Sequence, residues 1–181
     1  MLRLPVPLMD TPLTDLQPAL ATDLLRAEHA RIAAAFACYA AACAVDAERR
    51  ALATALVATA DLHLATERRM LYPLVRHEAD ALVQRLTDDH AVIRAAMDAA
   101  ITAADAGTRD AAVARLGRLL RDHAAAEEEH LFPQVERHLP NTLRRLGGDL
   151  ARRRAAGRAD VPDLDPLLDF ASTAALARAL R

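Results

Sequence analysis

Two stretches of the chain carry nearly the same unusual line. The first, HLATERRMLYP, begins at His63, and the second, HAAAEEEHLFP, begins at His123. In each stretch a Glu follows the His at the fourth position and a Pro follows it at the tenth. Residues i and i+4 of an α-helix lie on one face, one turn apart. The duplication therefore predicts two matched helices, each of which points a His and a Glu in one direction.

The duplication extends to the helices that precede these two lines. His29 matches His90 at almost the same offset that separates the two lines, and each follows an acidic residue, Glu28 or Asp89. Each half then reads as a helical hairpin with a His on its first helix and His-x-x-x-Glu on its second. Because solenoids need three or more repeats, two halves predict a single four-helix bundle.

The spacing of the histidines also predicts where the hairpins turn. His29 and His63 lie equally far along the chain from Asp46, which is placed to cap the helix that follows it. Gly107 has a similar place in the second half and is expected to end the third helix. When the two helices of a hairpin are equally long between the turn and each histidine, the histidines lie at the same height along the bundle axis. The expected helices cover approximately 22–46, 47–76, 79–107 and 109–138.

The composition favours a helical core with few aromatic side chains. Apolar residues make up 53% of the 181 residues but aromatic residues only 3%, so Ala, Leu and Val must form the core. Such residues favour closely packed helices, and the chain has few β-branched runs that would support a sheet. We therefore predict an all-α fold: an up-down-up-down four-helix bundle with short additional C-terminal helices.

Proline and glycine residues divide the chain into three expected parts. Residues 1–19 contain several prolines and are predicted to form an extended lead-in, and residues 20–140 form the bundle. Residues 141–181 form a helical C-terminal extension. Gly147 and its glycine neighbour are expected to break this extension into short pieces, and Asp165 followed by proline is expected to start a last helix.

Charge and cysteine content exclude several classes of protein. The net charge of −2 gives no attraction to nucleic acid, and Cys38 and Cys43 are too few for a disulfide framework or a structural zinc site. No apolar run is long enough to span a membrane, and the proline-interrupted N-terminus has no signal-peptide core. We expect a cytoplasmic protein that binds neither nucleic acid nor membrane.

Six side chains should converge at one level of the bundle axis. Imidazole and carboxylate groups together suit iron, manganese or zinc, and two carboxylates among four imidazoles can bridge two metal ions. A dry core that held these groups without a partner would be costly. The predicted metal ligands are His29, His63, Glu67, His90, His123 and Glu127.

The remaining histidines and two prolines lie outside this pattern. His77, His130 and His138 have no matching His in the other half, so we expect them in loops or on the surface. Pro73 and Pro133 fall inside helical patterns. Each removes a backbone hydrogen bond and is expected to kink its helix.

The doubled pattern, in which LYP or LFP follows each ligand Glu, resembles the hemerythrin-like HHE cation-binding family over about residues 20–140. The resemblance implies a four-helix bundle around a non-haem, carboxylate-bridged di-iron centre, with manganese or zinc as alternative metals. In that family one iron would be served by the first two histidines and the other by the last two. The implied bridges are Glu67 and Glu127.

One position departs from the oxygen-carrying members of this family. Those proteins have a second His one turn after the third-helix His, where this chain has Arg94. Four histidines would give a nearly symmetric centre with a free position on each iron, which argues against simple oxygen carriage. Glu28, Asp89 and Glu128 are close enough in sequence to orient the imidazoles or to bind metal themselves.

Three functions remain open at this stage. The first is a di-iron protein that binds or reacts with oxygen, nitric oxide or peroxide in stress protection or sensing, with weak peroxide or nitric oxide consumption. The second is a ferritin-like iron oxidase, for which only Glu127-x-x-His130 fits, since the first half has Met70 at the corresponding position. The third is an interaction module with a structural metal, in which the Arg-rich residues 144–158 bind a protein partner.

Overall fold

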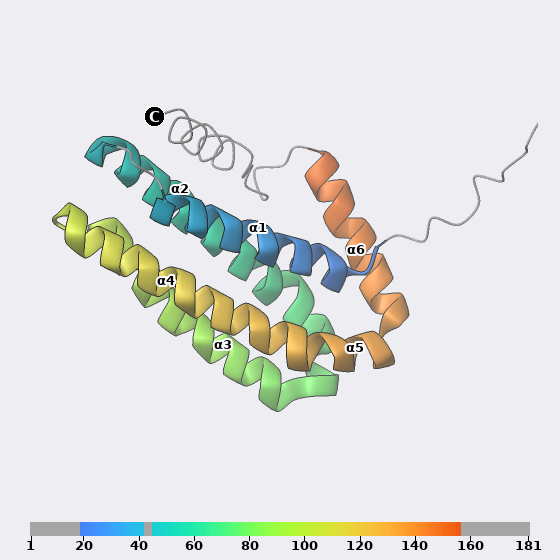
Figure 1. The fold of residues 1–181 in the computed structure, drawn as a ribbon. Helices are drawn as coiled ribbons and strands as arrows, with labels where there is room; N and C mark the ends of the chain where they lie inside the picture. The colour runs from blue at the N-terminus through green and yellow to red at the C-terminus, as the bar shows by residue number, and fades with distance from the viewer. Residues whose placement is uncertain (1–18, 42–44, 157–181) are drawn as a thin grey trace, which may run out of the picture.

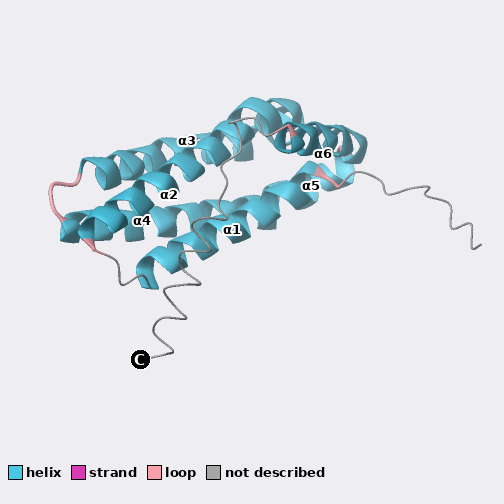
Figure 2. Ribbon diagram, turned by 90° about the horizontal axis from the view of Figure 1, so that it is seen from above, coloured by secondary structure: helices cyan, strands magenta, loops and turns pink. Residues whose placement is uncertain are grey.

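The structure, a computed structural model, describes residues 19–41 and 45–156, and all regular secondary structure in these ranges is helical. Four long helical segments lie side by side and form the bundle (Figures 1 and 2). The all-α, four-helix fold predicted from the sequence is confirmed. Most of the lead-in, Cys43 and the helix expected at Asp165 lie outside the described residues.

The bundle segments are longer than their α-helical parts because two of them continue through a π-turn. The second segment passes from α2 through η1 into α3, and the fourth passes from α4 through η2 into α5. The elements are α1 (Ala21–Ala41), α2 (Asp46–Thr66), η1 (Glu67–Leu71), α3 (Tyr72–Thr102), α4 (Ala106–Ala126), η2 (Glu127–Leu131), α5 (Phe132–His138) and α6 (Pro140–Ala155).

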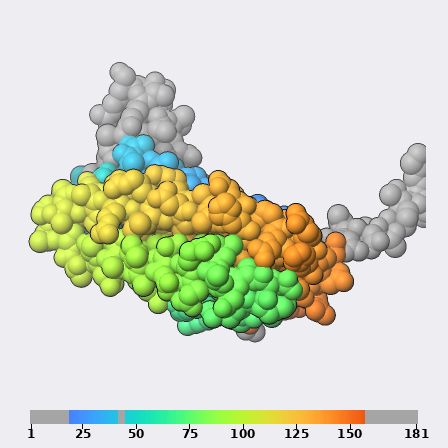
Figure 3. Space-filling view, turned by 90° about the horizontal axis from the view of Figure 1, so that it is seen from below, coloured from blue at the N-terminus to red at the C-terminus, as the bar shows by residue number. Residues whose placement is uncertain are grey.

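Within α3 the chain reverses at Ala79, where φ is −146° and ψ is 41°. This break separates the second bundle segment from the third, and it lies close to the end predicted at residue 76. Beyond it, α3 and α4 lie along each other on the face seen in Figure 3.

Two predicted helix boundaries were wrong. The third bundle helix ends at Thr102 and not at Gly107, because Asp105 caps α4 and places this glycine in its first turn. The Asp105 carboxylate accepts a hydrogen bond from the Thr108 N–H at 2.8 Å, and such a bond satisfies one of the free amides at a helix start.

Asp46 is also not the cap that the sequence suggested. Val45 occupies the N-cap position of α2, and Asp46 is the first helical residue. Its carboxylate accepts a hydrogen bond from the guanidinium of Arg109, a residue of α4 whose side chain is buried. A tertiary ion pair thus takes the place of the expected local cap.

Apolar residues form two clusters that lie on either side of one polar layer. The first cluster fills the end of the bundle at the α1–α2 turn and contains Ile32, Phe36, Leu56, Leu64, Ile93, Met97, Val113 and Leu116. The second lies at the opposite end, around α5 and α6, and contains Leu25, Leu71, Val75, Val83, Leu86, Leu131, Phe132 and Leu143. The six predicted metal ligands lie at the boundary between these clusters along their helices.

The first part of the C-terminal extension is one continuous helix, contrary to the short pieces predicted. α6 crosses the end of the bundle and packs against α1 (Figure 1). A Cβ added at Gly147 would collide with the carbonyl oxygen of Ala19, so this glycine permits close approach of two backbones. Tertiary packing therefore outweighs the low helix propensity of glycine. No described helix is long and apolar enough to cross a membrane.

Candidate metal centre

Six side chains from six successive elements meet inside the polar layer. The histidines come from α1, α2, α3 and α4, and the two glutamates come from the π-turns η1 and η2. None of the six is more than 8% exposed. The structure thus brings together all of the predicted ligands: His29, His63, Glu67, His90, His123 and Glu127.

The Glu67 carboxylate stands between two pairs of imidazoles. Its Oε1 lies 2.7 Å from His63 Nε2 and 3.6 Å from His29 Nε2. Its Oε2 lies 3.2 Å from His90 Nε2 and 3.5 Å from His123 Nε2. One oxygen therefore faces each pair, which is the arrangement that a carboxylate bridging two cations requires.

The Glu127 carboxylate is placed differently from that of Glu67. Its Oε2 lies 3.3 Å from His29 Nε2, and its Oε1 accepts a hydrogen bond from the Tyr72 hydroxyl at 2.8 Å. The ligand atoms form two groups, and within each group all atoms lie within 4.8 Å of one another. Glu67 belongs to both groups. The groups are His29, His63, Glu67 and Glu127, and Glu67, His90 and His123.

Tyr72 is a residue of the site that the sequence analysis did not assign. Its buried hydroxyl lies 3.3 Å from His90 Nε2 and 3.4 Å from His123 Nε2. At the matching position of the other half, the Phe132 ring stacks on His29 at 6.0 Å between centroids. A phenol faces one imidazole pair and an apolar ring faces the other. The two imidazole pairs therefore have different aromatic neighbours.

The π-turns explain why an aromatic side chain reaches the centre. The N–H of Tyr72 donates to the carbonyl of Glu67, the fifth residue before it, and Phe132 repeats this bond with Glu127. A π-turn stacks residue i+5 above residue i, whereas an α-helix stacks i+4. The proline that follows each aromatic residue has no N–H and clashes in a regular helix, so a wider turn accommodates it. The prolines thus produce π-turns where the sequence predicted simple kinks.

Carboxylates hold the outer nitrogens of the first imidazole pair. His29 Nδ1 lies 2.7 Å from Glu128 Oε1, and His63 Nδ1 lies 3.0 Å from Glu28 Oε2. Such partners fix the orientation of a metal-binding imidazole and leave Nε2 to bind the ion. Asp89 is 3.9 Å from His123 Nδ1, which has no hydrogen-bond partner. Two of the three acidic residues suggested by the sequence therefore orient histidines, and Asp89 makes no hydrogen bond there.

A second residue that the sequence missed extends this chain of contacts. Arg154, near the end of α6, donates a hydrogen bond to Glu28 Oε1, and both side chains are largely buried. Burial raises the pKa of Glu28, but the hydrogen bonds and charges of His63 and Arg154 outweigh it and hold this pKa below its usual range. The C-terminal helix thus contacts the outer shell of the centre.

Without a metal, the buried charges compensate one another. Burial lowers the pKa of His63, but the charges of Glu67 and Glu28, together with the hydrogen bond that His63 Nδ1 donates to Glu28, raise it to about 10. The pKa of His29 rises to about 9 for similar reasons: burial opposes the rise, and the close carboxylates of Glu127 and Glu67 outweigh burial.

The two glutamates respond in opposite directions to the same surroundings. Burial and the neighbouring Glu67 charge raise the pKa of Glu127. Burial acts in the same direction on Glu67, but the charge of His63 and the close imidazoles of His123 and His29 hold its pKa well below the usual range. The imidazoles therefore hold Glu67 in its charged form more strongly than Glu127.

Several inward-facing atoms have no hydrogen-bond partner, and this observation tests whether the residues fit a metal. They are His29 Nε2, both carboxylate oxygens of Glu67, and Glu127 Oε2. Unpaired buried polar atoms are costly, and each of these atoms offers a lone pair to the interior once His29 loses the proton on Nε2. A cation bound among them would satisfy all four, so the donor set fits a metal ion.

Other predicted residues lie away from the centre. His77, His130 and His138 are exposed, as expected, so His130 does not join Glu127 in the core as a ferritin-like oxidase would require. Arg94 Nε lies 3.9 Å from Asp61 Oδ1. The acid nearest to the guanidinium is therefore the largely exposed Asp61 and not one of the carboxylates of the centre.

Comparison with known proteins agrees with this geometry. The sequence profile of the hemerythrin HHE cation-binding domain matches residues 20–135. The chain belongs to the hemerythrin HHE family. Neither the curated proteins nor the solved structures that were searched gave a match. The matched residues include all six inward-facing His and Glu residues, whereas α6 and Arg154 lie beyond the matched hemerythrin domain. The domain and the buried cluster together fit a metal-binding helical protein.

Proposed function

We propose that this hemerythrin-like protein holds two iron ions per chain and binds or consumes a small molecule: oxygen, nitric oxide or peroxide. The observation that carries the proposal is the Glu67 carboxylate, which presents one oxygen to each imidazole pair in a buried layer. Bound iron would supply the redox chemistry and the coordination position for such a ligand. Manganese or zinc is the alternative occupant, and zinc would favour a structural role.

The chain's own residues have separate tasks in this proposal. Glu128 and Glu28 hold the outer nitrogens of His29 and His63 and thereby aim Nε2 at the metal position. The Tyr72 hydroxyl keeps a proton on the opposite side of the centre and donates it in a hydrogen bond to Glu127. Burial and the nearby carboxylates raise the pKa of Tyr72, so this proton is retained at neutral pH. The apolar clusters exclude water from both ends of the layer.

Elemental analysis with an optical spectrum tests this function. We expect two iron ions per chain and the near-ultraviolet absorption of a ferric pair. Glu67→Ala and Glu127→Ala should each lose more metal than His77→Ala, because His77 is exposed and far from the layer. One ion or none in fully loaded protein would contradict the proposal, and so would equal losses in the three variants. Zinc in place of iron would favour a structural metal.

A further inference from the structure

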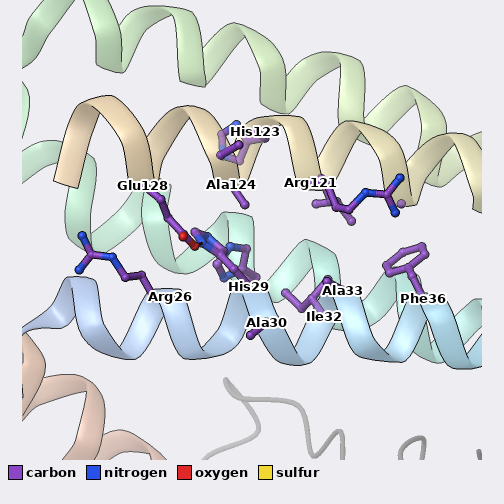
Figure 4. A pocket seen from close by; sticks show the side chains of 14 residues that line it. Arg26, His29, Ala30, Ile32, Ala33, Phe36, Arg121, His123, Ala124 and Glu128 are labelled. Carbon is purple, nitrogen blue, oxygen red and sulfur yellow. Dashed lines mark hydrogen bonds and ion pairs between the residues drawn. The ribbon is translucent and has the colours of Figure 1, made fainter. Parts of the chain in front are cut away.

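An apolar cavity of about 350 Å³ lies between α1 and α4 and leads to one side of the metal centre. Its walls include three imidazoles of the centre: His29, His63 and His123. Figure 4 shows His29 and Glu128 pointing toward each other across this space, with Phe36 and Arg121 farther along the groove. The cavity is therefore continuous with the site described above.

The cavity is much larger than the small molecules considered so far. One water molecule occupies about 30 Å³ in the liquid, and a diatomic gas is of similar size, so the space is roughly ten times too large for it. Cavities of this volume commonly bind small organic molecules. From His29 to Phe36 the groove extends about 10 Å along α1, given the helical rise per residue.

Small residues on both facing helices create this space. Ala30 and Ala33 line it on α1, and Gly117 and Ala124 line it on α4. A Cβ added at Gly117 would come within 2.9 Å of the Phe36 ring, so the glycine lets this ring lie against α4. The groove therefore exists because the four facing positions carry small side chains or none.

The charged groups at the rim differ in whether they already have partners. Arg26 donates to Glu136 at 2.6 Å, and Glu128 is engaged by His29 at 2.7 Å. Arg121 is exposed and pairs with no acid among the described residues. Within the buried wall, His29 Nε2 also has no hydrogen-bond partner. The groove therefore combines an apolar body with one available cation at its outer end.

We infer that this cavity binds a small organic acid with an apolar chain or ring of about eight carbons. The carboxylate pairs with Arg121, the chain lies along Ile32 and Phe36, and its far end reaches the metal centre beside His29. This inference rests on the proposed function in one respect: it names an organic acid as a molecule that approaches the proposed metal centre. Binding itself depends on the cavity and Arg121, and it can be measured without metal.

Octanoate is the probe, measured by isothermal titration calorimetry on the full chain before and after removal of metal. Octan-1-ol is the uncharged comparison. We expect saturable, one-to-one octanoate binding in both forms, with octanol roughly five- to tenfold weaker, as for loss of one charge-assisted contact. Arg121→Gln should weaken octanoate binding by the same factor and leave octanol binding unchanged. The control is Arg118→Gln, an exposed position on the same helix that does not line the cavity.

A second pair of variants tests the cavity. Ala33→Phe should fill it and abolish binding of both probes, whereas Ala34→Phe, at an exposed position outside the cavity, should not. Circular dichroism and thermal unfolding establish that each variant is folded. Absence of octanoate binding to the parent protein overturns the inference, and so does undiminished binding by folded Ala33→Phe. Two bound irons without octanoate binding would support the proposed function and overturn the cavity inference. Octanoate binding without iron would support the cavity inference and contradict the proposed function.

Discussion

Replacing Arg154 with Gln should weaken metal binding even though this residue lies outside the hemerythrin domain match. Arg154 donates to one oxygen of Glu28, and the other oxygen of Glu28 lies 3.0 Å from His63 Nδ1. The side chains of Arg154 and Glu28 are only 27% and 18% exposed, so solvent replaces the lost contact incompletely. The contact therefore transmits the docking of α6 to the orientation of a metal ligand.

The size of the effect on metal affinity depends on how many intervening contacts separate each residue from the metal ligand. Loss of a partner that directly holds a ligand imidazole costs about 10- to 100-fold in metal affinity, which is the range expected for Glu28→Gln. Arg154 acts one contact farther out, and Glu28 keeps its bond to His63 in the variant. We therefore expect a loss of roughly three- to tenfold, or about 0.7–1.4 kcal/mol.

Competition with a chromophoric chelator measures this loss, and Arg152→Gln is the matched control. Arg152 lies on the same helix, is 74% exposed and pairs with Asp149. Its removal should leave affinity within twofold of the parent. The double variant with Glu28→Gln should lose little more than Glu28→Gln alone, because both changes interrupt one chain of contacts. Parent-like affinity in Arg154→Gln, together with a large loss in Glu28→Gln, would refute the argument.

Three further predictions concern the stability of the metal-free fold and the position of Arg94. Because the pKa values of His29 and His63 rise from 6.5 to about 9 and about 10, their charged forms stabilise the metal-free fold fully below pH 6.5. This contribution declines as pH rises above 6.5 and is lost once pH has risen through 9–10. Over that interval the melting temperature of metal-free protein should fall more steeply than that of metal-loaded protein, and parallel curves would contradict this expectation. Tyr72→Phe leaves a buried Glu127 oxygen without its donor and should destabilise the metal-free protein by about 1–3 kcal/mol in urea unfolding, whereas an unchanged midpoint would argue against this bond. Arg94→His places an imidazole one turn after the third-helix ligand and should add a ligand, shift the iron absorption spectrum and slow peroxide consumption; a parent-like spectrum and rate would show that this position does not border the centre.

Local periodicity made the ligand set predictable from sequence. A His and a Glu at positions i and i+4 share a helix face whatever the rest of the chain does. The nearly equal out-and-back lengths of each hairpin then fix the height at which His29, His63, His90 and His123 meet. These relations depend only on the constant rise of an α-helix and on the apolar pattern, and the structure places all six side chains together accordingly.

The surroundings of the ligands could not be predicted in the same way. Tyr72 reaches the centre because a π-turn changes the stacking by one residue, and the prolines alone indicated only a disturbed helix. The signal available in the sequence was an aromatic residue at the fifth position after each ligand Glu. The two imidazole pairs differ in their surroundings because one half has Tyr72 and the other has Phe132. Which imidazoles each ring contacts depends on the packing across the bundle.

The contact between Arg154 and Glu28 was decided only by tertiary structure. These residues are 126 positions apart, and nothing in their local sequence links them. Their approach depends on how α6 crosses α1, which in turn depends on the absence of a side chain at Gly147. The sequence by itself determined the four bundle helices and the inward-facing ligands, because these follow from short-range geometry. Helix crossings and side-chain packing determined the partners of those ligands. These contacts join segments that are far apart in the sequence, and separation in the sequence does not predict distance in space.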